Sequence, residues 1–176
     1  SIEVGSVLSV MFIARINRVI VLNFYNSIYM AYKGRYKIKK PEKYLGDYSN
    51  VVYRSMWERQ TFKWCETNPS VKAWNSEEVV IPYKCKTDNK LHRYFVDLLV
   101  EMDNGKIFLV EIKPKKHTQP PKKRRKTKKY ISEVTQYVKN QSKWEAANQF
   151  AKHKGWKFQI WTEDTLNNLG IKLLKS

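Results

Sequence analysis

The chain has 176 residues, enough for one domain with a hydrophobic core, and its 34 Lys+Arg against 16 Asp+Glu give a net charge of +18. So large a positive charge favours a polyanionic partner, with nucleic acid as the first candidate and an acidic membrane surface as the second. The aromatic content of 14% argues against a purely disordered basic chain. Cys65 and Cys85 form no CxxC pair, so the sequence gives no basis for a disulfide framework or a zinc site.

Residues 1–29 are apolar, but Arg and Asn side chains interrupt them. This pattern does not fit a transmembrane helix, and the segment lacks the basic start and cleavage site of a secretory signal. Met30 is followed by a basic start, MAYKGRYKIKK. We therefore expect the functional protein to start at Met30, with 1–29 as an apolar leader of doubtful relevance.

Residues 30–54 are basic and rich in Tyr, and the breakers Pro41 and Gly46 predict an irregular N-terminal arm. Aromatic side chains in such an arm could stack on DNA bases or pack on a protein partner. The residues concerned are Tyr32, Tyr36 and Tyr44.

A helix is predicted at 55–66, because Ser55 and Glu58 form an S-x-x-E capping box in front of an apolar pattern. A strand follows at 78–85, in the sequence EVVIPYKC. Pro82 cannot donate a backbone hydrogen bond, which favours a position at the edge of a sheet.

Two stronger strands are predicted at 93–101 and 106–113, joined by the turn sequence MDNG. Residues 114–129 contain almost no apolar side chain and predict a basic loop. A helical pattern resumes at 130–153, followed by a strand in WKFQIWT and a last helix. This order of elements predicts one α/β domain over 55–176, with a mixed central sheet flanked by helices.

Charged residues interrupt both strands of the predicted hairpin. Glu111 and Lys113 share one face of the second strand, since residues two apart point the same way. A two-residue turn would pair Asp97 with Ile112 and scatter the charges over both faces. A three-residue loop ending in a left-handed Gly105 would pair Asp97 with Glu111 instead. We favour the second register, because it gathers the charges on one face of two apolar strands.

Adjacent carboxylates repel each other, and one becomes protonated unless a cation lies between them. A hard divalent cation, Mg²⁺ or Mn²⁺, removes this cost and prefers oxygen ligands. Asp97 and Glu111 are therefore candidate catalytic metal ligands of a phosphodiesterase. Lys113 could hold the attacking water or offset charge on the scissile phosphate.

Asp97, thirteen intervening residues and the triplet EIK resemble the PD-(D/E)xK nuclease signature, with Val96 in place of the usual Pro. The resemblance implies a restriction-endonuclease-like core. It also implies a further acid from the preceding helix, for which Glu58 is the candidate catalytic residue and metal ligand. A polar residue from the following helix would support the site, and Gln141 is the candidate.

Several of these residues have a structural alternative. Glu58 could serve as the cap of its helix, as a metal ligand, or as both. Gln141 falls on the apolar stripe of its helix, where a satisfied core amide is an equal alternative. His92, His117 and His153 are scattered without metal-ligand spacing, and we expect surface positions for them.

Longer stretches, among them GRYKIKKPEKYLGD and HRYFVDLLVEMDNGKIFLVEIKPKK, resemble the head completion nucleases of T-even-type bacteriophages. The resemblance covers nearly the whole chain after the leader. It implies a Mg²⁺-dependent deoxyribonuclease that processes packaged DNA before head–tail joining. Its partners would be double-stranded DNA and phage head–neck proteins, with no membrane, and its location would be the host cytoplasm during assembly or the virion.

Two other functions stay open on the sequence alone. A nuclease fold can persist without turnover, which would make the chain a non-catalytic DNA-clamping head–neck protein. A junction-resolving or mobile-element endonuclease with a similar core is the other alternative.

The run KKRRK within the basic loop resembles a nuclear localisation signal, but the phage resemblance favours an arm that binds phosphates without sequence preference. The candidate DNA-binding residues are Lys115, Lys116, Lys122, Lys123, Arg124, Arg125 and Lys126. Lys139 and Lys143, in the helix that follows, are expected to be solvated.

Overall fold

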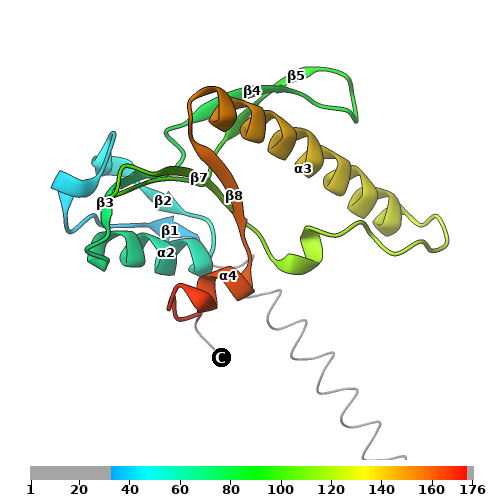
Figure 1. The fold of residues 1–176 in the computed structure, drawn as a ribbon. Coiled ribbons are helices and arrows are strands. Elements are labelled where there is room, and N and C mark those ends of the chain that lie inside the picture. Colours follow the sequence, from blue (N-terminus) through cyan, green and yellow to red (C-terminus); the bar gives the residue numbers. More distant parts are fainter. Residues whose placement is uncertain (1–32, 174–176) are drawn as a thin grey trace, which may run out of the picture.

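The structure is a computed structural model and describes residues 33–173. A central sheet has the strand order β3-β6-β7-β8 (Figure 1). Its strands are β3 (Val71–Asn75), β6 (Leu98–Met102), β7 (Ile107–Ile112) and β8 (Lys157–Trp161). Only the β7–β8 pair is parallel among these neighbours, so the sheet is mixed, as predicted. The predicted leader and Tyr32 lie outside the described residues.

One face of the central sheet packs against two helices, α2 (Met56–Thr67) and α4 (Glu163–Asn168). Leu98 and Val110 point to this face, where they meet Phe62 and other buried side chains. Because successive strand residues alternate in direction, their neighbours along each strand point to the opposite face.

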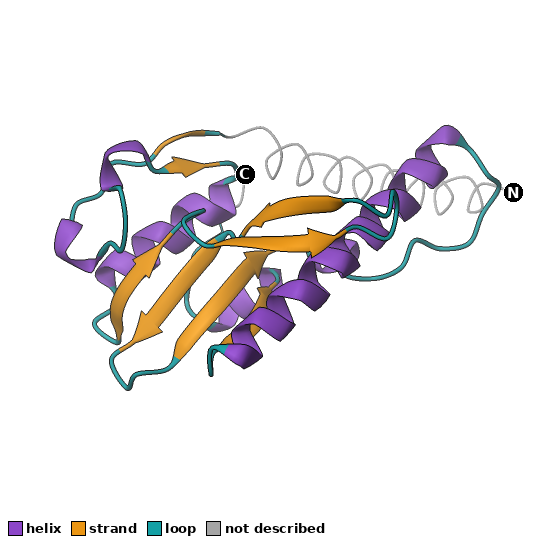
Figure 2. Ribbon diagram, turned by 90° about the horizontal axis from the view of Figure 1, so that it is seen from above, coloured by secondary structure: helices purple, strands orange, loops and turns teal. Residues whose placement is uncertain are grey.

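The opposite face packs against α3 (Lys128–His153) and a hairpin of β4 (Val80–Lys84) and β5 (Leu91–Phe95). Leu109 lies on this face and packs in one cluster with Ala147 of α3. Figure 2 shows α3 running along the sheet, with its first turns extending past the strands. The charged residues of the predicted site lie on this second face.

Residues 33–54 are packed onto the domain, although the sequence predicted an irregular arm. The short strands β1 (Gly34–Arg35) and β2 (Val52–Tyr53) pair with each other. The buried carboxylate of Glu66 accepts a hydrogen bond from the Tyr36 hydroxyl at 2.7 Å. Tyr44 is 7% exposed and packs on Trp74. Both tyrosines are therefore held by contacts within the domain, whereas the sequence suggested that they stack on DNA bases or pack on a protein partner.

The predicted strand 93–101 is in fact two strands, with a bend at Asp97 between them. The backbone N–H of Val96 donates to the carbonyl of Val79 at 3.0 Å, which holds the end of β5 to the small hairpin. After the bend, β6 enters the central sheet. β3 was not predicted, because its sequence VKAWN mixes polar and apolar residues without a clear alternation.

The predicted helices are confirmed. α3 begins at Lys128, slightly before the predicted start, because the Thr127 hydroxyl accepts a hydrogen bond from the backbone N–H of Tyr130 at 3.1 Å. Ile131 in its first turns is 54% exposed, since this end of the helix projects past the sheet.

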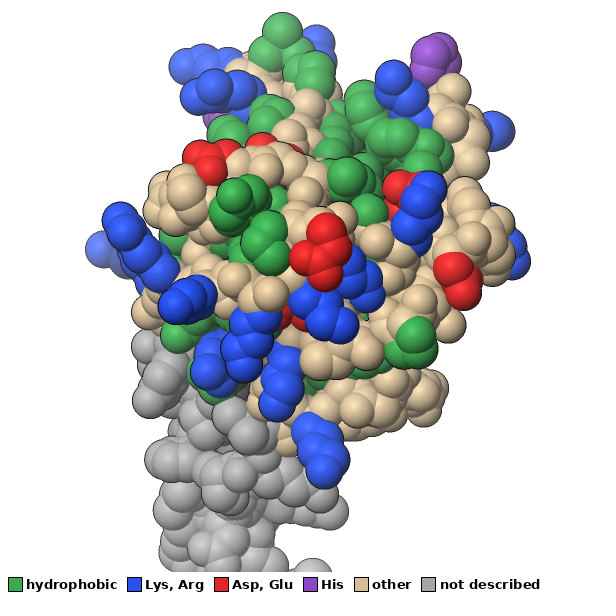
Figure 3. Space-filling model, turned by 90° about the vertical axis from the view of Figure 1, so that its left-hand side faces the viewer, with side chains coloured by type: hydrophobic (Ala, Val, Ile, Leu, Met, Phe, Trp, Pro, Cys, Tyr) green, Lys and Arg blue, Asp and Glu red, His purple; other side chains and the backbone are tan. Residues whose placement is uncertain are grey.

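Lys and Arg side chains are spread over the face of the molecule that Figure 3 shows, with acidic side chains between them only in places. The positive charge is thus not confined to the basic loop. Within residues 33–173, no helix is long and apolar enough to cross a membrane.

Candidate active site

The hairpin of β6 and β7 has the register that the sequence analysis favoured. Leu98 pairs with Val110, and the loop ends in Gly105, whose φ of +80° is left-handed. The residues beyond the Leu98–Val110 pair are Asp97 and Glu111. The prediction that a three-residue loop brings these two carboxylates together is therefore confirmed.

Glu111 is the buried centre of the cluster, with 4% of its surface exposed. One carboxylate oxygen accepts a hydrogen bond from the Tyr94 hydroxyl at 2.5 Å. The other forms an ion pair with the Lys113 ammonium at 2.9 Å. These two contacts fix the carboxylate in one orientation.

Asp97 lies at the bend before β6. Its carboxylate accepts a hydrogen bond from the backbone N–H of Ile112 at 2.8 Å. Burial, together with the charges of Glu111 and Glu58, raises the pKa of Asp97 well above its usual range. Without a bound cation, these surroundings favour the protonated form of the Asp97 carboxyl.

Lys113 is the cation that the site does contain. Burial acts against its ammonium, but the charges of Glu111 and Asp97 outweigh burial and raise the pKa of Lys113. Its side chain is 21% exposed, so the ammonium is partly open to solvent beside the carboxylates.

Glu58 approaches this cluster but serves the cap of α2. Its carboxylate accepts hydrogen bonds from the backbone N–H of Arg54 at 2.7 Å and from the Ser55 hydroxyl at 3.0 Å. The negative charge of Glu58 also contributes to the raised pKa of Asp97 and of Lys113, so this carboxylate acts electrostatically on the cluster from the start of α2.

Two residues that the sequence analysis missed complete the surroundings of Glu111. Tyr94 comes from β5 and donates to the carboxylate. The Lys143 ammonium lies over the Tyr94 ring, 5.3 Å from its centre. Burial lowers the pKa of Lys143, while the nearby charge of Glu111 opposes this effect. Lys143 was expected to be solvated but is half-buried, and the available signal was its position beside the buried Trp144 on α3.

Gln141 is half-buried and does not join the cluster. Two residues along a helix correspond to a rotation of about 200°, so Gln141 and Lys143 face different sides of α3. None of the hydrogen bonds found in the described residues joins Gln141 to the carboxylates. The supporting role suggested for Gln141 stays a prediction.

A family model described as "TnsA-like endonuclease N terminal" matches residues 68–163. The chain belongs to this endonuclease family. The head completion nuclease of Enterobacteria phage T4 is 43% identical over 148 residues, which cover 81% of this chain and 99% of that protein. The resemblance seen in the sequence is confirmed, and the mixed sheet with its flanking helices is a restriction-endonuclease-like fold, as predicted.

The segment matched by the TnsA-like endonuclease family contains Asp97, Glu111 and Lys113, together with most of α3. Glu58 lies outside it.

The basic loop of this TnsA-like endonuclease is partly tied to the domain. The Lys115 ammonium pairs with Asp164 at 2.8 Å, and Arg124 pairs with Glu133. The other predicted DNA-binding residues have exposed side chains along the loop. They are Lys116, Lys122, Lys123, Arg125 and Lys126.

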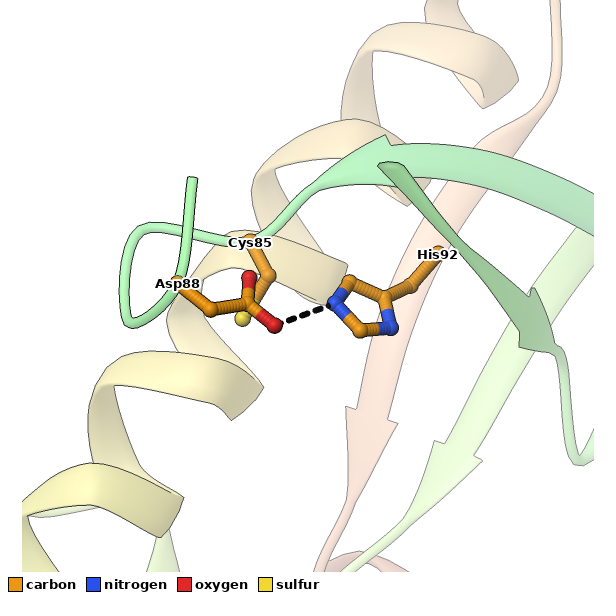
Figure 4. Close-up of side chains that lie close together, drawn as sticks. All are labelled: Cys85, Asp88 and His92. Atoms are coloured by element: carbon orange, nitrogen blue, oxygen red, sulfur yellow. Dashed lines mark hydrogen bonds and ion pairs between the residues drawn. The ribbon is translucent and has the colours of Figure 1, made fainter. Parts of the chain in front are cut away.

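A second group of potential metal ligands lies in the β4–β5 hairpin (Figure 4). The ligand atoms of Cys85, Asp88 and His92 lie within 4.8 Å of one another, a grouping that the expectation of scattered histidines missed. Asp88 pairs with His92 at 2.8 Å and accepts a hydrogen bond from the backbone N–H of Lys90 at 3.0 Å. Cys85 shares a hydrogen bond with Thr87 at 3.0 Å. We assign no metal to this group, because the Cys85 sulfur, the Asp88 carboxylate and the Nε2 atom of His92 already have hydrogen-bonding partners.

Proposed function

We propose that this protein is a divalent-metal-dependent DNA nuclease that acts in phage head completion. The observation that carries the proposal is the buried Glu111 carboxylate beside the half-buried Asp97, with the Lys113 ammonium 2.9 Å from Glu111. Two adjacent carboxylates with a perturbed pKa destabilise the fold, and groups of this kind are found most often at functional sites. The pair is therefore a candidate for catalysis. Membership of the TnsA-like endonuclease family supports hydrolysis of DNA, and the similarity to the T4 head completion nuclease supports the biological role.

The donor set fits a hard divalent cation such as Mg²⁺ or Mn²⁺. Asp97 and Glu111 would hold it, because carboxylate oxygens are the ligands that these ions prefer and because a cation would remove the repulsion that raises the pKa of Asp97. A bound ion would supply Lewis acidity and an activated water for attack on phosphorus. Glu58 could assist from the cap of α2.

The protein's own side chains would orient the substrate around this pair. Tyr94 keeps the Glu111 carboxylate in place through its 2.5 Å hydrogen bond. Lys113 would stabilise the negative charge that grows on the scissile phosphate. Lys143 would supply a second positive charge from α3, on the same side of the sheet. The site would thus surround a phosphate with cations from two elements.

The net charge of +18 and the basic loop would bind the DNA backbone. Contacts of this kind do not read bases, so the enzyme would act on double-stranded DNA without sequence specificity. In head completion, the substrate would be packaged DNA processed before head–tail joining. The protein would then contact head–neck proteins, in the host cytoplasm during assembly or as part of the virion.

Cleavage of linear and closed-circular DNA by the purified protein tests this proposal. The reactions contain Mg²⁺ or EDTA, and the variant is Glu111→Ala with Glu101→Ala as the matched control. Glu101 lies on the same hairpin and pairs with Lys72 at 2.7 Å, away from the cluster. We expect cleavage that needs the metal, disappears in Glu111→Ala and persists in the control, while all three proteins bind DNA. Loss of the circle would establish endonucleolytic action.

The opposite result would favour the non-catalytic alternative. If wild type and Glu111→Ala bind DNA equally and neither cuts it with any divalent metal, the catalytic proposal fails. The protein would then be a DNA-clamping assembly protein on a nuclease fold.

A further inference from the structure

A pocket of about 570 Å³ opens beside the proposed catalytic centre, between the basic loop and α3. Lys113 forms part of its wall, so the pocket and the carboxylate cluster share one side chain. The volume lies in the range of about 300–1,000 Å³ that is typical of small-ligand sites, and it is too small for a duplex. An occupant of the pocket would lie directly next to the phosphate that Lys113 is proposed to contact.

The wall formed by α3 is polar and partly aromatic. Gln136, Tyr137 and Asn140 line it, at positions that share one face of the helix. Asn140 is only 4% exposed, although it carries an amide. The Gln136 amide donates to the Asn140 carbonyl at 2.9 Å, which leaves the other amide groups of the pair for a ligand.

The wall formed by the loop is cationic. Lys113 and Lys116 supply the positive charge, and His117 lies beside them with its pKa lowered by burial, which favours the neutral imidazole. The one acid in the lining, Glu133, is paired with Arg124. A ligand with a phosphate, a flat ring and hydrogen-bonding edges would match these features, and a nucleotide has all of them.

We propose that this pocket binds one unpaired nucleotide next to the scissile phosphate, so that the preferred substrate is DNA with an unpaired strand at the point of cleavage. In a duplex the base edges are occupied by pairing, and the ring faces by stacking. Only an unpaired or extruded base could present its edge to Gln136 and Asn140 and its face to Tyr137. The proposal rests on the proposed nuclease function and adds a substrate class to it.

The test compares two DNA substrates of the same sequence, one fully paired and one with a splayed, unpaired arm. Initial cleavage rates are measured in Mg²⁺ for wild type, Gln136→Ala and Tyr137→Ala. Gln149→Ala is the matched control, because Gln149 is an exposed residue on α3 outside the pocket. We expect wild type to prefer the splayed substrate. Tyr137→Ala should lose about tenfold of that preference, the effect of one base–aromatic stacking contact, and Gln136→Ala should lose part of it with the hydrogen bond to the base edge. The control should keep it.

Equal rates on both substrates in wild type, or an unchanged preference in the pocket variants, would overturn the pocket proposal while leaving the nuclease function intact. If wild type cuts neither substrate, the proposed nuclease function is wrong. The pocket proposal is then tested by measuring DNA binding instead of cleavage. The probe is then a short fluorescent oligothymidylate, measured by anisotropy. Weaker binding by Gln136→Ala and Tyr137→Ala than by Gln149→Ala supports the pocket, and equal binding by all of them rejects it.

Discussion

Two hairpins of this molecule gather potential metal ligands, and their carboxylates lie in opposite electrostatic settings. In the β6–β7 hairpin, burial and the charge of Glu111 raise the pKa of Asp97. In the β4–β5 hairpin, hydrogen bonds from the Lys90 backbone and from His92 lower the pKa of Asp88. The first carboxylate costs stability in the absence of a bound cation, whereas the second stabilises its own turn. Unfavourable charge that the fold retains indicates function more strongly than the mere proximity of ligand atoms.

The largest expected effect separates the two hairpins by activity. Asp97→Asn should lower the rate of DNA cleavage in Mg²⁺ by at least about 10³-fold, because one of the two proposed metal ligands loses its charge. Asp88→Asn should leave the rate within about twofold of wild type, since surface substitutions away from a site have small effects. Gel-based initial rates measure both. A similar loss in the two variants would remove the distinction between the hairpins.

Substitutions in the basic loop should affect DNA binding more than chemistry. The loop adjoins the β6–β7 cluster and has several lysines and arginines with exposed side chains. The variant replaces Lys122, Lys123, Arg125 and Lys126 by Ala. Its DNA affinity at moderate salt should fall about 100-fold, and the slope of log affinity against log salt should become shallower by about three to four. Fluorescence anisotropy at several salt concentrations measures this effect.

The control for the loop uses lysines beside the other hairpin. Lys84→Ala combined with Lys90→Ala removes charge near the β4–β5 cluster and should leave the salt slope nearly unchanged. An equal change of slope in the loop variant and in this control would show that the loop has no special part in binding DNA.

The residues that hold Glu111 should have intermediate effects. Tyr94→Phe removes the hydroxyl that donates to Glu111, and Lys143→Ala removes the charge beside it. We expect each to lower kcat/KM for cleavage by about tenfold or more, because preorganised charge stabilises the transition state. Lys152→Ala, on an exposed face of the same helix, is the control and should keep the wild-type value. If Tyr94→Phe and Lys143→Ala both cleave DNA at the wild-type rate, neither residue contributes to catalysis. The site would then consist of the residues predicted from the sequence.

The smaller effect concerns stability without metal. A raised pKa means that folded Asp97 holds its proton more tightly than the unfolded chain does. Its contribution to the free energy of unfolding is therefore complete below about pH 4 and is lost as the pH rises towards the folded pKa. At neutral pH in EDTA, Asp97→Asn should be more stable than wild type by about 1 kcal/mol or more, while its activity is lost.

The sign is reversed in the other hairpin. The lowered pKa of Asp88 gives a contribution that is present above about pH 4 and is lost as the pH falls through the folded pKa. Asp88→Asn should therefore reduce stability at neutral pH. Urea unfolding between pH 4 and pH 8 measures the change in stability that each variant causes. A gain of stability in both variants would contradict the opposite effects predicted for Asp97 and Asp88.

The last prediction is an absence of effect. Because the polar atoms of Cys85 and His92 already have partners, adding Zn²⁺ in the presence of wild-type or Cys85→Ser protein should give the same thermal unfolding temperature. Differential scanning fluorimetry measures it. A Zn²⁺-dependent rise in wild type that Cys85→Ser loses would establish a metal site in the β4–β5 hairpin and would reverse the assignment made above.

Local rules explain why much of the fold could be predicted. The start of α2 follows from Ser55, whose hydroxyl accepts the backbone N–H of Glu58 at 3.1 Å. The register of the β6–β7 hairpin follows from the left-handed Gly105 and from the need to place the charges on one face. Both features depend on residues that are close together in the chain, so the sequence alone was sufficient.

The rest required the arrangement of elements that are far apart in the chain. Tyr94 reaches Glu111 only because the chain bends at Asp97 and folds β5 over the sheet. Lys143 arrives from α3, which packs on the same face. Glu58 was left open as cap, metal ligand or both; its carboxylate makes the cap contacts, and its charge also acts on Asp97.

By itself, the sequence determined the family of this protein, its helices and the paired carboxylates beside Lys113. The tertiary structure alone decided that the N-terminal segment joins the core through Glu66, and that a pocket lies next to Lys113. The physical reason is the distance along the chain over which each kind of interaction acts. Caps, turns and strand alternation act over a few residues, whereas the order of the strands and the face that each helix covers depend on the packing of the whole domain.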